Sequence, residues 1–420
     1  MTQRLFGKAQ ALAGVFKASV LSFVAIFAFA IYDFILPIFT EDQSGSFALV
    51  GIIVSLVYVA SLLAEVPVGL AVDRYGRIKV ILIAMSLLSA LGVAYYFVNN
   101  IIFLAMLSLV TGTIAVAFWV PSTVLVRDFS PRKMLSQSQG VYLTITQLGW
   151  IAGPILAGIV SETISDKHNF FIFAGLMFAA VIAGLIIFRG KEAKEFHKIE
   201  KGHKHKARIS LLITTFEEYI KLHKHAMPLY LLSFFAYVWI ALEWSFIALI
   251  GIERFGFSET LAGLLVGTMM IIEGLLYFTS GYLMDKIGTK YILTAGFLLL
   301  FASSYFAFLV ASPAAFILAV LLAAGATSWI LPGTESLLTK IVPANIMGEM
   351  SSVFDTSKDF GLIAGPLVGG LLASFMGSPQ ASLIAVFVAA AAATVLAGYV
   401  FWPEQKAGRL KLFKKNHSLK

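Results

Sequence analysis

The sequence predicts an all-α membrane protein with twelve transmembrane helices in two pseudo-symmetric six-helix bundles, and three observations lead to this prediction. The 420 residues are 59% hydrophobic and only 13% charged, which is more apolar than the surface of a soluble protein allows. Twelve apolar runs are long enough to cross a bilayer. Motifs of the first half recur in the second half at a constant offset, which indicates an internal duplication of parallel bundles.

The apolar runs form two groups of six, separated by a polar stretch. Each run approaches or exceeds the roughly 20 residues that a bilayer requires. They occupy residues 15–39, 46–72, 78–98, 100–126, 134–162, 168–188, 226–252, 258–284, 290–310, 313–340, 346–375 and 380–402. The predicted domains are an N-terminal bundle (1–188), a cytoplasmic linker with an amphipathic helix (189–225), a C-terminal bundle (226–402) and a basic cytoplasmic tail (403–420).

The basic residues indicate membrane topology rather than binding to nucleic acid. Of the 31 Lys and Arg residues, all except Lys167, Arg254 and Lys358 fall in loops and tails on one side of the predicted membrane. The positive-inside rule places that side, and with it both termini, in the cytoplasm. We therefore expect a multi-pass protein of the plasma (inner) membrane whose basic loops contact anionic lipid, and we expect a monomer.

Several classes of chemistry are not expected from this sequence. Cysteine is absent, and the seven histidines all fall in predicted loops or tails, so neither a disulfide nor an intramembrane metal site is expected. The chain lacks a Gly-x4-Gly-Lys-Ser/Thr loop for ATP, a His-Glu-x-x-His motif and a serine nucleophile elbow. We expect no enzyme activity, no cofactor and no bound metal.

A basic turn follows the second apolar run, and a related turn follows the eighth run 212 positions later. In these turns Gly69 would permit close helix packing, Gly76 a tight turn, and Asp73 could accept hydrogen bonds from helix N-terminal amides. The motif residues are Gly69, Asp73, Arg74, Gly76, Arg77 and Lys79 in the first turn, and Gly281, Asp285, Lys286, Gly288 and Lys290 in the second.

Glycine and proline recur together in the fifth and eleventh runs, again 212 positions apart. Small residues on one face let helices pack closely, whereas proline frees a carbonyl group and kinks a helix. Both a bending point and simple close packing remain open for these runs. The residues are Gly149, Gly153, Pro154 and Gly158 in the fifth run, and Gly361, Gly365 and Pro366 in the eleventh.

Carboxylates inside the apolar runs are the main candidates for function. A charged side chain in the membrane costs roughly 2.5–3.5 kcal/mol on insertion scales, so such groups must face a cavity, form pairs or bind protons. Lys358 is the one basic residue that lies more than two positions inside the ends of a run. The acids are Asp33, Glu65, Glu243, Glu273, Glu335, Asp355 and Asp359.

Two of these acids stand out, and the others have alternatives that remain open. Asp33 and Glu243 are the first candidates for proton binding, and Glu273 could instead pair with a gating group. Asp355, Lys358 and Asp359 share a helix face, so one acid could neutralise Lys358 while the other titrates, or Lys358 could hold an anionic substrate. Glu335 could serve as an inner proton exit or gate. Nearby aromatic residues suit lipophilic cations or ordinary packing, namely Tyr32, Trp239 and Trp244.

The twin turn motifs and the two six-helix halves closely resemble the major facilitator superfamily. The Gly-Pro run of the fifth helix, and Asp33 followed by Pro37, are most similar to its drug–proton antiporter-type members. This resemblance implies alternating access to a central cavity, a cytoplasmic latch at the turn motif, protons as coupling ion, and proton-coupled export of hydrophobic or cationic small molecules. The family also includes uptake carriers for small metabolites (organic anions or sugars) and lipid or lysolipid transporters, which remain alternatives. One departure is that residues 106–112 lack the fourth-helix Arg common in these antiporters.

Overall fold

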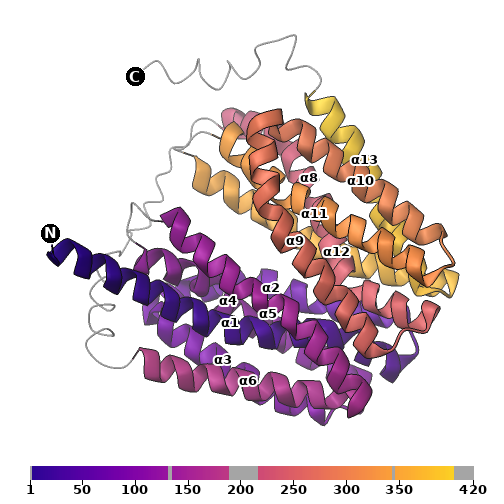
Figure 1. Cartoon of the computed structure of the whole chain (residues 1–420), viewed down its shortest axis with the longest axis horizontal. Helices are drawn as coiled ribbons and strands as arrows, with labels where there is room; N and C mark the ends of the chain where they lie inside the picture. Colours follow the sequence, from indigo (N-terminus) through magenta and orange to yellow (C-terminus); the bar gives the residue numbers. More distant parts are fainter. Residues whose placement is uncertain (1, 131–134, 189–215, 343–345, 402–420) are drawn as a thin grey trace. The chain divides into compact units, whose positions relative to one another are not determined.

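The computed structural model describes residues 2–130, 135–188, 216–342 and 346–401, and these residues are almost entirely helical (Figure 1). The first half contains α1 (Thr2–Ser44), α2 (Phe47–Tyr75), α3 (Arg77–Tyr96), α4 (Ile101–Phe129), α5 (Leu135–Thr163) and α6 (Asp166–Ile187). The second half contains α8 (Phe216–Phe255), α9 (Glu259–Ile287), α10 (Thr289–Leu309), α11 (Pro313–Ile341), α12 (Met347–Met376), a 3-10 turn (Pro379–Ser382) and α13 (Leu383–Phe401).

Twelve helices are long and apolar enough to cross a membrane, which confirms the predicted fold class. α1, α2, α4, α8 and α9 end three or more residues beyond the predicted apolar runs, and the other helices end within two residues of them. In α1 the helix continues to Ser44 because the hydroxyl groups of Thr40 and Ser44 donate to Leu36 O and Thr40 O, at 2.6 Å each. Such back-bonding satisfies polar side chains within a helix, so a polar end does not stop it.

The seventh membrane helix begins earlier than its apolar run. The predicted amphipathic helix over residues 209–222 lies partly outside the described residues, and its described part forms the first turns of α8. The helix then continues without a break into the apolar span Ala226–Phe255. The rest of the predicted linker and the tail 403–420 lie outside the described residues.

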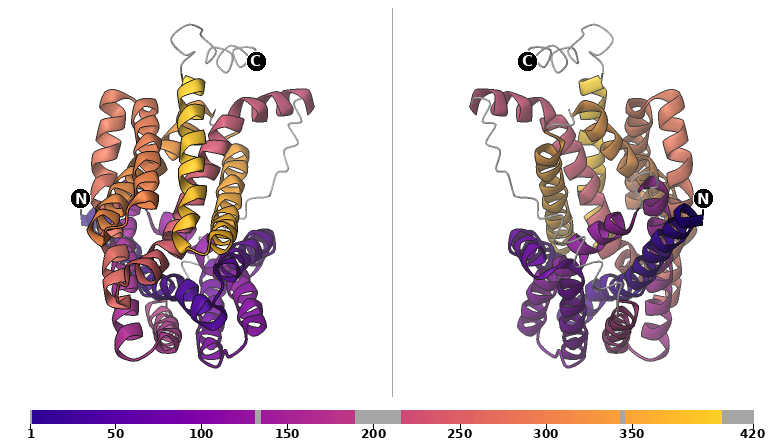
Figure 2. Two further views of the ribbon diagram at one scale, coloured as in Figure 1. Left: turned by 90° about the vertical axis from the view of Figure 1, so that its right-hand side faces the viewer. Right: turned by 90° about the vertical axis from the view of Figure 1, so that its left-hand side faces the viewer.

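The chain divides into two compact units. The first comprises Met1–Ile209 together with Gly256–Met270, and the second comprises Ser210–Phe255 together with Ile271–Lys420. In the first unit α1 packs on α5, α2 on α4, and α3 on α6. In the second unit α8 packs on α12, while α10 packs on both α11 and α13 (Figure 2).

An aromatic cluster forms the core of the first unit. Tyr32 of α1 and Tyr95 of α3 are buried, their hydroxyl groups are 2.9 Å apart, and the rings meet edge to face. Phe170 of α6 stacks on Tyr95 with ring centroids 4.8 Å apart. Thr111 of α4 lies 3.1 Å from the Tyr95 hydroxyl, so four helices meet at one hydrogen-bonded aromatic centre.

A buried glutamine closes one end of the second unit. Gln380, in the 3-10 turn before α13, donates its amide N–H to Ala307 O at 2.5 Å and to Phe308 O at 2.8 Å. These carbonyl groups lie in the last turn of α10, where no later helical N–H is available to them. Gln380 therefore satisfies the end of α10 and joins α10 to α13.

Large apolar side chains also point outward, as expected for helices that contact lipid. Phe278 is 87% exposed and Phe375 is 90% exposed, and both lie in membrane-spanning segments. In water such residues would favour aggregation, whereas in hydrocarbon they are in their preferred surroundings.

Candidate functional site

The two turn motifs each depend on a glycine with positive φ. Gly76 has φ 89° and donates its N–H to Val72 O at 2.9 Å, which ends α2 immediately before α3 begins. Gly288 has φ 111° and donates to Met284 O at 3.0 Å between α9 and α10. A side chain disfavours this backbone conformation, so the prediction of a glycine-dependent turn is confirmed at both places.

The charged residues of both motifs lie outside the helix packing. Asp73, Arg74 and Lys79 are exposed in the first turn, while Arg77 is half-buried; Asp285 and Lys286 are exposed in the second, and Lys290 is half-buried. A Cβ atom at Gly69 or Gly281 would meet nothing within 4 Å, so close helix packing at Gly69 stays a prediction. The latch role of the charged residues stays a prediction.

The glycines of the Gly-Pro runs are packing positions. In α5, a Cβ atom at Gly149 would lie 3.0 Å from Phe27 N, and at Gly153 it would lie 2.3 Å from the Ala30 Cβ atom of α1. Gly158 meets the backbone of Glu259, which belongs to the same compact unit, and in α12 Gly361 and Gly365 meet the backbone of α8. Both helices continue through Pro154 and Pro366. The contacts support close packing, while a bending role stays a prediction.

Asp33 lies in the C-terminal third of α1 with tyrosine residues near it. Its side chain is half-buried, and the hydroxyl groups of Tyr32 and Tyr58 are nearby. Within the described residues no Lys or Arg forms an ion pair with Asp33. Tyr32 itself is buried in the aromatic core and shares its hydroxyl with Tyr95, so it does not present that group as a cavity wall here.

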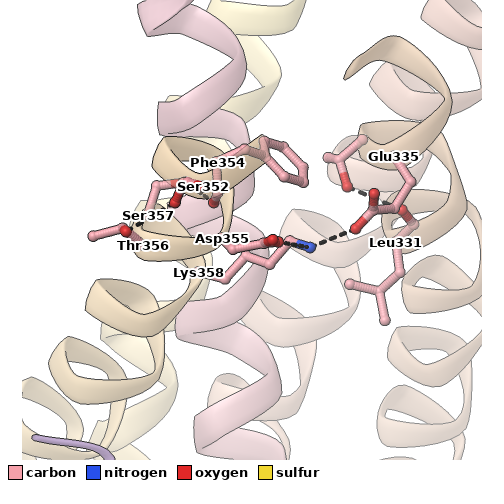
Figure 3. Close-up of polar contacts among 9 residues, drawn as sticks. Leu331, Glu335, Ser352, Phe354, Asp355, Thr356, Ser357 and Lys358 are labelled. Atoms are coloured by element: carbon pink, nitrogen blue, oxygen red, sulfur yellow. Dashed lines mark hydrogen bonds and ion pairs between the residues drawn. The ribbon is translucent and has the colours of Figure 1, made fainter. Parts of the chain in front are cut away.

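Lys358 is held by carboxylates from two helices (Figure 3). Its Nζ atom lies 2.8 Å from Asp355 Oδ1 on the same helix and 2.5 Å from Glu335 Oε1 on α11. The Phe354 ring lies 4.5 Å and the Tyr237 ring 5.6 Å from Nζ. Of the two acids predicted to neutralise Lys358 from its own helix face, Asp355 does so, and Glu335 of α11 joins it. Asp359 is half-buried at the next position of α12.

Glu243 and Glu273 lie together in the second unit. Glu243 of α8 is completely buried and Glu273 of α9 is 4% exposed, and the two acids are close enough to interact electrostatically. Tyr277 donates its hydroxyl to Glu273 Oε2 at 3.5 Å. Buried Trp239 donates its indole N–H to Thr327 on α11 at 2.7 Å, whereas Trp244 is half-buried one position after Glu243.

Sequence patterns did not single out Tyr277 or Thr327. Tyr277 follows Glu273 by one helical turn, so a search for polar partners at that spacing finds it. Thr327 lies 88 residues after Trp239, and no local pattern connects them. Within the described ranges no group of three or more His, Cys, Asp or Glu residues could hold a metal ion.

Comparisons with solved structures agree with this architecture. The nucleoside transporter NupG aligns with a TM-score of 0.75 and 13% identity, over 92% of this chain and 98% of that one. A bacterial homologue of the iron transporter ferroportin aligns with a TM-score of 0.72 and 14% identity, over 93% and 98% of the two chains. At these identities the likeness concerns the fold alone.

Comparisons of sequence identify the family. Multidrug resistance protein 2 of Bacillus subtilis is 24% identical, over 83% of this chain and 86% of its own. A homologue of the multidrug resistance efflux pump PmrA from Lactococcus lactis is 26% identical over 78% of each chain. The model of the Major Facilitator Superfamily matches twice, at residues 18–249 and 229–418. The chain is therefore a multi-pass membrane transporter, not an enzyme, and it belongs to the Major Facilitator Superfamily.

Proposed function

We propose that this transporter exports hydrophobic or cationic small molecules in exchange for protons, by alternating access. Two of its relatives are named as multidrug resistance proteins, which supports this substrate class. We further propose that it lies in the plasma membrane as a monomer, with both termini in the cytoplasm and the motif around Asp73 acting as a cytoplasmic latch. The arrangement of basic residues in the loops supports this orientation.

The observation that carries the proposal is a set of membrane carboxylates without a basic partner. Asp33 in the first unit, and Glu243 and Glu273 in the second, have no ion pair with a described Lys or Arg residue. An ionised carboxylate inside a membrane span and without a cation is disfavoured, so each of these acids must bind a proton or face a positively charged ligand. Groups that alternate between these two states couple proton movement to cation movement.

The alternative of anion uptake receives less support from the geometry. That alternative needs Lys358 as an anchor for an organic anion, but Asp355 and Glu335 already bind its Nζ atom. With two acids and one base, the cluster is net negative and would repel an anion. No observation in the described chain favours a sugar or a lipid over a cation.

Reconstituted transport tests the proposal directly. The purified protein is placed in liposomes that contain a pH-sensitive dye, a proton gradient is imposed, and lipophilic cations, sugars and organic acids are added in turn. We expect proton flux with the cations, and we expect Asp33→Asn to abolish it. Asp42→Asn is the matched control because Asp42 is exposed near the end of the same helix. Flux triggered only by an anion or a sugar, or full flux in Asp33→Asn, would contradict the proposal.

A further inference from the structure

The turn between α9 and α10 gathers lysines that no acid of the described chain neutralises. Lys286 lies in the last turn of α9, Lys290 in the first turn of α10, and Lys340 one residue before the end of α11. Among the described residues none of these three forms an ion pair. Asp285 directly precedes Lys286, but consecutive residues of a helix do not face each other. Three positive charges therefore need a partner from outside this part of the chain.

Lys340 is fixed at the start of α10. Its Nζ atom donates to Thr289 Oγ1 at 2.6 Å, and the buried Thr289 hydroxyl lies 3.3 Å from Ser336 Oγ of α11. This contact uses one of the three ammonium protons. The N-cap residue Gly288 offers no side-chain acceptor to the first amides of α10, which adds positive potential at the same place. Consecutive Cα atoms are 3.8 Å apart, so the Cα atoms of residues 286 and 290 lie within about 11 Å of that of Thr289.

The first half has different residues at the corresponding positions. The helices α4 and α11 each contain 29 residues, and α4 has Asp128 at the position that Lys340 occupies in α11. Arg77 begins α3, whereas Thr289 begins α10. A base and an acid in the first half thus correspond to a hydroxyl group and a base in the second. The excess of positive charge is a property of the second turn and not of the duplicated fold.

Two exposed tyrosines lie beside these lysines. The Nζ atom of Lys286 is 5.8 Å from the centroid of the Tyr282 ring, and that of Lys290 is 4.9 Å from the centroid of the Tyr291 ring. Tyrosine favours the boundary between hydrocarbon and water, and lysine extends its charge from that boundary toward the lipid headgroups. The basic corner therefore lies at the level of the headgroups.

One face of α9 leads from the hydrocarbon to this corner. Leu275, Phe278 and Tyr282 are exposed, and with Lys286 they follow one another at the spacing of a single helix face. All four lie in the membrane span Glu259–Ile287. At 1.5 Å per residue this face is about 16 Å long, which is close to half the thickness of the hydrocarbon layer. A soluble anion would leave such a face uncovered, whereas a phospholipid covers it with an acyl chain.

We propose that Lys286, Lys290 and Lys340 bind the phosphate of an anionic phospholipid whose acyl chain lies along the exposed face of α9. A zwitterionic lipid brings its own positive charge to the headgroup, so three unpaired lysines favour a lipid with a net negative charge. The site adds a structural partner to the transporter and does not depend on which solute is carried.

Lipid binding to the purified protein tests the site. The protein in detergent is titrated with phosphatidylglycerol or with phosphatidylcholine of the same acyl chains, and native mass spectrometry counts the bound lipid. We expect the first phosphatidylglycerol to bind more tightly than phosphatidylcholine. The double variant Lys286→Gln/Lys340→Gln should weaken its binding about thirtyfold, because each basic residue near an anionic lipid contributes about a factor of five.

The duplicated turn supplies the matched control. Arg74→Gln/Lys79→Gln removes two exposed basic residues from the first turn and should leave the binding of the first phosphatidylglycerol unchanged. Equal weakening in both double variants, or equal affinity for the two lipids, would overturn the site. Inorganic phosphate forms a third arm, and if it displaces phosphatidylglycerol at equal concentration, the site belongs to a soluble anion and the lipid proposal is wrong.

A single variant keeps the test decisive if the double variant does not fold. Lys290→Gln leaves the contact between Lys340 and Thr289 in place, and it should weaken the binding of phosphatidylglycerol about fivefold. Thermal unfolding without added lipid checks that each variant is folded. Undiminished binding of phosphatidylglycerol to a folded Lys290→Gln variant would contradict the assignment.

Discussion

Trp239 on α8 donates its indole N–H to the hydroxyl group of Thr327 on α11 across 2.7 Å, and both side chains are buried. Thr327 in turn donates to Ala323 O, one helical turn earlier. This chain of two hydrogen bonds joins two helices of the second unit beside Glu273.

Replacing Thr327 with valine should destabilise the protein. Valine has nearly the same shape, but it leaves the buried indole N–H without an acceptor, at a cost of about 1 kcal/mol. Thermal unfolding of the purified protein in detergent measures the loss. Thr327→Ser keeps the hydroxyl group and should lose less stability. Equal loss in both variants would mean that the methyl group matters and the hydrogen bond does not.

Lys358 should contribute to stability through both of its carboxylate partners. Lys358→Gln leaves Glu335 and Asp355 without their cation, and because both acids are about half exposed, we expect a loss of about 1 kcal/mol. Removing one of the two uncompensated charges, in Lys358→Gln/Glu335→Gln, should recover part of the loss. Thermal unfolding checks this, and a double variant less stable than the single variant would contradict the ion cluster.

The fold could be predicted from the sequence because lipid imposes the same rule on every residue of a span. In lipid the backbone N–H and C=O groups must hydrogen-bond within the segment itself, so an apolar run of sufficient length commonly forms a membrane-spanning helix. This requirement does not determine where a helix begins or ends in a polar segment outside the lipid. The first turns of α8, from Phe216 onward, are polar but helical, and no apolar pattern marks their start.

The candidate site was only partly predictable, because partners in space do not follow from positions in sequence. The spacing along one helix predicts that either Asp355 or Asp359 can neutralise Lys358, and the structure shows Asp355 in that role. Glu335 lies 23 residues before Lys358 on another helix, and Glu273 lies on a different helix from Glu243, so no periodicity connects either pair. The acids can be identified from the sequence because a charged residue inside an apolar run is conspicuous. Which side chains they point toward depends on how the helices pack.

Two glycines of α12 should not tolerate a methyl group. A Cβ atom at Gly361 would lie 2.5 Å from Phe234 O, and at Gly365 it would lie 2.6 Å from Val238 O, so the α8 backbone must move. Overpacking of this kind costs about 1–3 kcal/mol, and thermal unfolding of each alanine variant measures it. Gly69→Ala is the control: its site is open, and alanine favours a helix by about 0.5–1 kcal/mol, so its stability should not fall.

The turn glycine of the first motif should be irreplaceable for a reason that differs from packing. Gly76 has φ 89° and ψ 149°, a region that is open to glycine and closed even to asparagine. Both Gly76→Ala and Gly76→Asn should therefore cost about 1–3 kcal/mol in thermal unfolding.

Gly377, which ends α12, provides the comparison for Gly76. Its φ of 65° and ψ of 26° are left-handed helical values, which asparagine adopts readily, and a Cβ atom there would meet nothing within 4 Å. Gly377→Asn should therefore be nearly neutral, while Gly76→Asn is not. If asparagine were equally tolerated at both positions, the turn between α2 and α3 would not depend on the backbone of Gly76. The motif would then act through its charged residues alone.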